Sequence, residues 1–391
     1  MKNNSVLENS SSSSTGESVR PAKVTVLVLM IMAIVLSAAL LTGPAVGPAV
    51  SAEETAEERL SLEEALLLLE EHSTDLKIAE LELSNAGVAY DKAQAELIRT
   101  ESRLQELSAE LQFQQAQQQY RSSLLGIYLT FMNDYQELQN LERELEIAEE
   151  EVGLARRKLR EVEDEVEAGY EPLIELLRQQ MELNNSLYER DETEADLEKR
   201  RRDFRSKLEL EYIPYLTSRL VGLEEMNIPG RQEAVEMALD HSSRLETAGL
   251  SRDLARVELE RAELSDSPSL DILELENNLE LAELEVDQVR EEVEEDVLDQ
   301  LHRVNQAGRQ VELAGDNLEQ AEEHLRITRE QREAGLISRT ELDEAQLERN
   351  RVELEKQQAL TSYMAAYFEL REMLGVDLEV IRDEILSAFT E

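Results

Sequence analysis

The sequence contains no cysteine and no tryptophan, and only 4% of its 391 residues are aromatic. Without cysteine the chain cannot form disulfides, and it offers no thiol to a catalytic or metal site. Few aromatic residues, together with only 7 prolines and 14 glycines, argue against a thick globular core with many turns. The apolar side chains must therefore be buried in a thinner structure.

Positive charge is also scarce. Lysine and arginine number 40 against 87 aspartates and glutamates, which gives a formal net charge of -47. Because phosphate binding needs clustered basic residues, this balance argues against nucleic acid and anionic lipid as partners. Two explanations of the acidic surface stay open: a solvated face suited to a salty habitat, or a duct wall whose carboxylates favour cations.

Signals of catalysis are missing as well. The chain has only 4 histidines and no Gly-rich phosphate loop, while its carboxylates are spread along the whole sequence. His72 and His241 occupy equivalent places in two related segments. We interpret both as residues that close a short helix, where an imidazole favours the negative end of the helix dipole, and not as metal ligands. We therefore expect no enzyme, no metal site and no cofactor.

What the sequence does contain is a duplication. The segment LSLEEALLLLEEHSTDLKIAEL at 60–81 shares five positions with RQEAVEMALDHSSRLETAGL at 231–250, with an offset of 169 residues. A second pair follows in the same order, because EAGYEPLIELLRQQ at 167–180 matches EAGLISRTELDEAQ at 333–346 with an offset of 166 residues. Two landmarks per copy in one order indicate a tandem repeat.

Both copies have the composition and spacing of long helices. Charged residues make up 32% of the chain, and apolar residues recur three and four positions apart. Ser61 with Glu64, three residues later, predicts a capping box at the start of the first helix. In the second copy Leu270–Ala334 and Arg339–Leu374 are predicted as helical arms, the first about 95 Å long. Helices of this length need packing partners along their whole length.

Each copy also predicts a tight turn between two helices. Gly169 and Gly335 can end a helix in the left-handed conformation that favours glycine. Pro172 then suits the first turn of the following helix, and Ser338 is predicted to cap its counterpart. Two different sequences for one turn suggest that the helical tip itself matters.

The composition changes divide the chain into five segments. Residues 1–52 are predicted as a signal peptide cleaved after Ala52, or alternatively as a membrane anchor formed by the apolar run Val24–Leu41. Residues 53–210 form the first repeat and 231–375 the second. Between them 211–230 is a connector that contains prolines and glycines, and 376–391 is a C-terminal tail. Either fate of the leader puts the acidic part outside the cytoplasm.

Four motifs in register carry a family resemblance. They are the opening Leu60-Ser61-Leu62-Glu63-Glu64-Ala65-Leu66, the two tips around Gly169 and Gly335, and the ending YMAAYFELREMLG at 363–375. Together they resemble the TolC-like outer-membrane efflux proteins, over residues 60–375. The resemblance implies an all-α fold of two tandem repeats of long antiparallel helical hairpins, assembled as a homotrimer around a hollow helical barrel.

One departure from the family is clear in the sequence. The family interrupts each repeat with a pair of β-strands in the outer membrane, and such strands need about ten residues of alternating apolarity. Residues 97–119 are instead charged, rich in glutamine and favourable to helix, and only 265–271 mark a break in the second repeat. We therefore expect the membrane β-strands to be reduced or absent.

The resemblance also implies a function and its residues. The chain would be the helical duct of an efflux or secretion system in the outer membrane and periplasm, acting with an adaptor protein and an inner-membrane exporter. Adaptor docking would use Ala168, Gly169 and Tyr170 at the first tip and Ala334, Gly335, Leu336 and Ser338 at the second. An acidic cluster beside the first tip forms either a duct entrance or a solvated helix face: Glu161, Glu163, Asp164, Glu165 and Glu167. The alternative function is an extracytoplasmic coiled-coil scaffold that conducts nothing.

Overall fold

The computed structural model describes residues 59–390 except 101, 213–214, 223–225 and 266. The predicted leader, its cleavage after Ala52 and the alternative anchor at Val24–Leu41 lie outside the described residues. Residues 57–391 form one compact unit by their internal contacts. In the part that is described, none of the helices combines the length and the apolar character needed to cross a bilayer.

The helices confirm the duplication. The first repeat contains α2 (Leu62–His72), α3 (Thr74–Thr100), α4 (Arg103–Glu167) and α5 (Leu173–Lys207), and the second contains α6 (Arg231–His241), α7 (Ser243–Leu264), α8 (Ser269–Glu333) and α9 (Arg339–Met373). Helices α2 and α6 both have 11 residues, α4 and α8 both 65, and α5 and α9 both 35. The copies differ in length only at α3 and α7, which have 27 and 22 residues, and in the turns that follow them.

The predicted capping residues form the expected hydrogen bonds at the helix starts. The hydroxyl of Ser61 accepts a hydrogen bond from the backbone N–H of Glu64, and the Glu64 carboxylate accepts one from the backbone of Ser61. Ser338 and Glu341 form the same reciprocal box before α9. Pro172 lies one position earlier than predicted, at the N-cap of α5. The two predicted arms of the second repeat are α8 and α9, each within one residue of its expected end.

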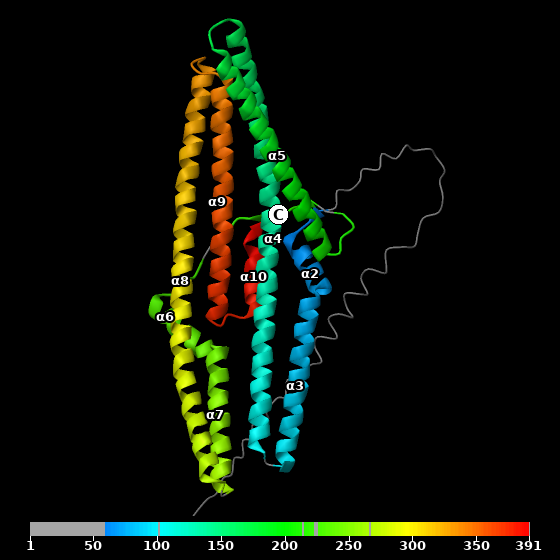
Figure 1. The fold of residues 1–391 in the computed structure, drawn as a ribbon, viewed down its shortest axis with the longest axis vertical. Coiled ribbons are helices and arrows are strands. Elements are labelled where there is room, and N and C mark those ends of the chain that lie inside the picture. The colour runs from blue at the N-terminus through cyan, green and yellow to red at the C-terminus, as the bar shows by residue number, and fades with distance from the viewer. Residues whose placement is uncertain (1–58, 101, 213–214, 223–225, 266, 391) are drawn as a thin grey trace, which may run out of the picture. The chain divides into compact units, whose positions relative to one another are not determined.

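The helices lie side by side in a layer (Figure 1). Toward the tips the order across the layer is α5, α4, α9 and α8, and toward the other end it is α3, α4, α7 and α8. Helices α4 and α8 run through both halves, so they join the upper hairpins to the lower ones. A layer of this kind buries apolar residues along helix seams, which explains how the chain folds with so few aromatic residues.

The largest core lies at the waist, where the upper and lower hairpins meet. Aromatic side chains of three helices are nearly fully buried there: Phe131 and Tyr135 of α4, Phe204 of α5, and Tyr367 and Phe368 of α9. The first and last described segments close over this core by pairing with the connector. Strand β1 (Arg59–Leu60) runs parallel to β2 (Tyr215–Leu216), and β3 (Arg219–Leu220) runs antiparallel to β4 (Phe389–Thr390).

The C-terminal residues are part of the fold. Helix α10 (Leu378–Ser387) occupies most of the segment that the sequence suggested as a tail. Its residues Leu378, Ile381 and Ile385 follow the three- and four-residue spacing of an amphipathic helix, and all three are buried in the waist core. Short length alone made this segment look like a tail.

The regions in which the family places its strands are helical. Residues 97–100 belong to α3 and residues 103–119 to α4. In the second repeat α7 ends at Leu264 and α8 begins at Ser269. The structure therefore confirms an all-α fold of tandem helical hairpins, with membrane strands replaced by helix at both predicted places.

Candidate functional site at the helical tips

The first tip is a helix C-cap followed directly by the next helix. Gly169 has a φ of +78°, and its N–H donates to the carbonyl of Val166 at 3.0 Å. The N–H of Tyr170 donates to the carbonyl of Glu165 at 2.9 Å, which completes a Schellman motif. Glu171 and Pro172 follow, and α5 begins at Leu173, so the tip consists of only a few residues.

The second tip repeats this geometry with different side chains. Gly335 has a φ of +73°, and the N–H of Leu336 donates to the carbonyl of Gln331 at 2.9 Å. The guanidinium of Arg332 donates to the carbonyl of Ile337 at 2.9 Å, which ties the turn to α8. Hydrogen bonds from Ser338 lower the pKa of the Glu341 carboxyl in the capping box of α9.

The tips project into solvent. Tyr170 is 83% exposed and Leu336 is 74% exposed. A Cβ built on Gly169 or Gly335 would have no described atom of the chain within 4 Å, apart from immediate neighbours. The glycines are therefore required by the backbone conformation and not by crowding, and they leave a narrow end that another helix can approach closely.

The acidic residues beside the first tip fall into two groups. Glu161 accepts a hydrogen bond from the hydroxyl of Thr340 at 2.6 Å, so it belongs to the contact between α4 and α9. The other four side chains are exposed on the last two turns of α4 and have no ion-pair partner among the described residues: Glu163, Asp164, Glu165 and Glu167. Glu161 thus contacts α9, whereas the other four carboxylates face solvent.

Between the tips and the waist, a seam with a seven-residue period joins the two repeats. Ile147 and Leu154 of α4 pack with Leu347 and Leu354 of α9 to form a small apolar cluster. Both pairs are spaced seven residues apart, as in a coiled coil. Glu161 with Thr340 occupies the next position on this line, so the apolar centre ends in a polar contact toward the tips.

Polar pairs flank the apolar centre on both sides, and their α4 members keep the seven-residue period. One row consists of Arg157–Asp343 at 2.8 Å, Glu150–Asn350 at 2.9 Å, Arg143–Glu353 at 3.6 Å and Gln136–Gln357 at 3.2 Å. The other row consists of Lys158–Glu344 at 2.5 Å, Glu151–Arg351 at 3.0 Å and Glu144–Gln358 at 3.1 Å. Half-exposed pairs add about 0.2–1 kcal/mol each, so they fix the register of the seam more than its strength.

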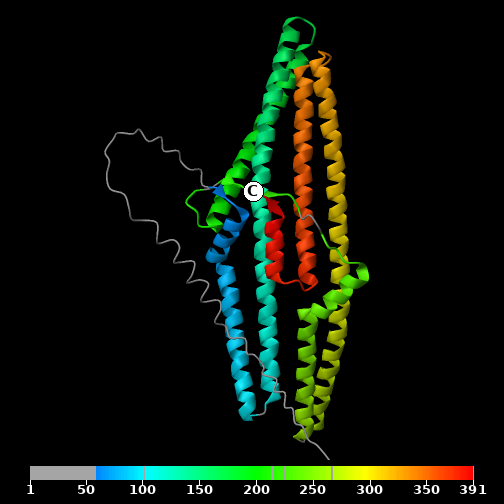
Figure 2. The same cartoon turned by 180° about the vertical axis from the view of Figure 1, so that it is seen from behind.

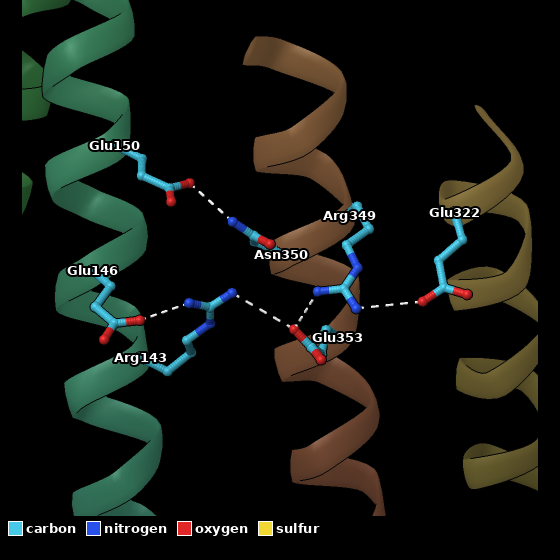
Figure 3. A network of polar contacts seen from close by, with 7 residues as sticks. All are labelled: Arg143, Glu146, Glu150, Glu322, Arg349, Asn350 and Glu353. Carbon is cyan, nitrogen blue, oxygen red and sulfur yellow. Dashed lines mark hydrogen bonds and ion pairs between the residues drawn. The ribbon is translucent and has the colours of Figure 1, made fainter. Parts of the chain in front are cut away.

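Figure 3 shows how one part of this seam continues into α8. Arg143 lies between Glu146 of its own helix and Glu353 of α9. Arg349 then joins Glu353 to Glu322 of α8, at 2.6 Å and 3.3 Å. Charges of alternating sign therefore connect three neighbouring helices, and the two hairpins are held as one layer.

Comparisons with known proteins agree with this arrangement. Residues 274–376 match the family described as outer membrane efflux protein. This stretch covers most of α8, the second tip and all of α9. In this stretch the chain is similar to the outer membrane efflux proteins. No curated protein matches it.

Solved structures extend the likeness to both repeats. The structure of CusC is 13% identical with a TM-score of 0.56, and the match covers 81% of this chain and 92% of that one. The outer membrane protein VceC from Vibrio cholerae is 13% identical with a TM-score of 0.57, over 81% and 96% of the two chains. The Campylobacter jejuni CmeC outer membrane channel is 13% identical with a TM-score of 0.56, over 84% and 89%. At this identity the likeness establishes the fold.

The two repeat-equivalent histidines each contact the residue that follows the last long helix of their repeat. They end α2 and α6, as predicted. His72 lies 3.2 Å from the carboxylate of Glu209, the left-handed residue that follows α5. His241 contacts the equivalent residue after α9, Gly375, so closely that a Cβ on the glycine would lie 2.2 Å from the His241 Cβ. The described residues contain no cluster of three or more side chains that could hold a metal ion.

One half-buried carboxyl lies near this second histidine contact. Burial raises the pKa of Glu372 on α9, and the nearby Arg121 partly opposes the shift. Arg121 itself donates to the carbonyl of Val376 at 3.3 Å. Burial at this place therefore favours the protonated carboxyl over the charged carboxylate.

The sequence identified the tips but not the seam. The seven-residue spacing is visible in each of the two segments, at 143, 150 and 157 and at 343, 350 and 357. It does not say which segments pair, because α4 and α9 are about 200 residues apart. The duplication placed equivalent helices in each repeat without showing that the last helix of one repeat packs on the middle helix of the other.

Proposed function

We propose that this chain is the helical duct of an efflux or secretion system in the cell envelope. Three copies would form a closed ring of helices, and the tips would contact an adaptor that leads to an exporter. The observation that carries this proposal is that the layer has two open edges, each with an exposed apolar stripe.

One open edge is the outer side of α8. Its large exposed apolar residues lie on one side of this 65-residue helix, as their spacing shows: Leu270, Leu273, Leu281, Leu284, Leu313 and Ile327. The opposite side of α8 packs against α7 and α9. A monomer would leave this stripe in water over most of the length of the molecule.

The other open edge consists of α5 above the waist and α3 below it. On α5 the stripe consists of Tyr170, Leu173, Ile174, Leu177, Met181 and Tyr188, all exposed. On α3 it continues with Ile78, Leu81 and Val88. Because the two edges are different surfaces, they would join head to tail, and such contacts form a ring when the rotation closes.

The tips support the adaptor part of the proposal. Ala168, Gly169, Ala334 and Gly335 present little side-chain bulk at the exposed ends of both hairpins. A helical hairpin of another protein could approach them without displacing a core residue. Tyr170 at the first tip and Leu336 at the second would then provide exposed apolar contact area.

An image of the purified full-length chain by electron microscopy tests the ring. The proposal expects three copies around a central channel. The alternative, a coiled-coil scaffold that conducts nothing, is favoured by helix at 97–100, 103–119 and 269–271, where the family places membrane strands. A solid bundle or an extended rod without a channel would support the scaffold and contradict the duct.

A further inference from the structure

The lower end of α5 carries an unusual concentration of positive charge for so acidic a protein. Residues 199–207 read KRRRDFRSK and contain six of the 40 basic residues of the chain. Arg200, Arg201 and Lys207 turn toward α4 and pair with Glu137, Glu142 and Asp134. Three of the six basic residues thus form ion pairs between α5 and α4.

The other half forms an exposed basic patch, which consists of Lys199, Arg202 and Arg205. All three side chains are exposed, and none has an ion-pair partner in the described part of the chain. The core side of α5 at this level is marked by Leu197, Phe204 and Leu208, so Lys199 and Arg202 lie on the side that faces away from the molecule.

At the opposite edge, α6 presents charge of the other sign. Ala234 and Ala238 are buried against α8. On the other side of the helix, at positions three and four residues apart, lies the acidic face formed by Glu233, Glu236 and Asp240. These carboxylates are exposed and have no cationic partner among the described residues, and Glu236 accepts only a hydrogen bond from Gln232.

The basic patch and the acidic face lie at opposite edges of the layer near the same height. Figures 1 and 2 both show α6 crossing α8, with the N-terminal end of α6 beyond α8 at one edge of the layer and the lower end of α5 at the other edge. Arg200 bonds to Glu137 of α4, and the neighbouring Gln136 bonds to Gln357 of α9, so Arg200 and Gln357 lie at about the same height. Gln300, in the region of α8 that packs on α6, bonds to Ala366 of α9 and lies at the height of that residue.

Those two positions on α9 are about 13 Å apart along the helix. Along α5, Arg205 lies about 7 Å below Arg200, which reduces this difference in height by the same amount. The remaining gap is about one helical turn, which long arginine and glutamate side chains can span. In a head-to-tail ring, the two surfaces would therefore face each other.

We propose that a second copy of this chain binds at the waist through an electrostatic clasp, in which the basic patch of one copy contacts the acidic face of α6 in the next. This inference rests on the ring of the proposed function and adds to it a specific contact. The apolar stripes bring the edges together, and the clasp fixes which height on one edge meets which height on the other.

A second copy fits the basic patch better than a polyanion does. The chain has a net charge of -47, so its long-range field repels nucleic acid and acidic polymers before three local charges can act. Two copies repel each other as well, but they also share complementary apolar edges. Short-range pairing at the waist then acts within one Debye length, about 10 Å at 0.1 M salt.

Charge reversal with rescue tests the clasp. One variant changes Lys199, Arg202 and Arg205 to Glu, a second changes Glu233, Glu236 and Asp240 to Lys, and a third combines both sets. The matched control changes three exposed basic residues of the inner helices α4 and α9 to Glu: Arg156, Arg160 and Lys356. Sedimentation of the full-length chain at a series of concentrations gives the dissociation constant of the ring.

We expect each single-sided reversal to weaken the ring about tenfold or more, the control to leave it within about twofold, and the combined variant to restore it. A ring that is equally strong in wild type and both reversed variants would overturn the clasp and leave the ring in place. Combined reversal without rescue would also overturn it. A wild-type chain that stays monomeric at every concentration would instead overturn the ring itself.

Discussion

Three glycines with nearly the same backbone conformation allow strain and crowding to be separated. Gly169, Gly335 and Gly375 each follow a helix C-terminus with φ values of +78°, +73° and +77°. Alanine at any of them would suffer the left-handed penalty of about 1–2 kcal/mol. Their surroundings differ, because an added Cβ meets no described atom within 4 Å at the two tips but lies 2.2 Å from the His241 Cβ at Gly375.

The expected losses of stability follow from this difference. Gly169→Ala and Gly335→Ala should each lower the free energy of unfolding by about 1–2 kcal/mol, the cost of backbone strain alone. Gly375→Ala should add an overpacking cost of roughly 1–3 kcal/mol, because the Cβ of a helical residue cannot move aside as a flexible side chain does. Urea unfolding followed by circular dichroism measures all three variants on one scale.

A second substitution decides whether the contact with His241 causes the extra loss. His241→Gly removes the Cβ that an alanine at position 375 would strike, whereas His241→Ala keeps it. The double variant Gly375→Ala with His241→Gly should recover more of the stability lost in Gly375→Ala than the double variant with His241→Ala, which keeps the nearest of the three His241 atoms. Equal losses at all three glycines, or equal behaviour of the two double variants, would refute the steric argument.

Three further predictions concern the seam, the buried carboxyl and the tips. Leu347→Ala should lower the free energy of unfolding by about 2–3 kcal/mol, because Leu347 fills the small apolar centre between the repeats; a loss below about 0.5 kcal/mol in urea unfolding would show that the polar rows hold the hairpins without it. Burial raises the folded-state pKa of Glu372, so the folded state binds the proton more tightly and stability from this group falls as pH rises through the raised pKa. Glu372→Gln should therefore be more stable than wild type at neutral pH, and the difference should shrink as the pH falls toward the usual carboxyl range; a constant difference across that pH range would contradict the assignment. Gly335→Leu should reduce binding to the adaptor encoded by the same organism in a pull-down while thermal melting falls only slightly, and Gly87→Ala, inside α3, should leave both nearly unchanged; undiminished adaptor binding by Gly335→Leu would remove the second tip from the mechanism.

Local signals in the sequence were sufficient for the helices. The capping residues Ser61 and Ser338 and the stop residues Gly169 and Gly335 act within one turn of the chain, so their positions fixed helix ends to within about one residue. The tip residues could be named for the same reason.

Contacts between distant segments could not be predicted in this way. Asn350 pairs with Glu150 across 200 residues, and α10 finds its place only because Ile381 and Ile385 fill the waist core. A periodic pattern indicates that a helix has an apolar side, but it does not indicate which other helix of this chain packs against that side. The pairing is decided by the packing of the whole layer.

The strands at the waist have a consequence for the order in which the molecule can be completed. Leu60 and Leu220, near the start and the middle of the described chain, are buried beside Phe389, near its end. Contacts between residues so far apart form late, because the intervening chain must first be ordered. A chain that lacks residues 378–390 should therefore hold formed hairpins around an open waist, with Phe131 and Tyr135 accessible to chaperones and proteases. Pairing of β4 with the connector thus marks the step at which the waist core becomes closed to other molecules.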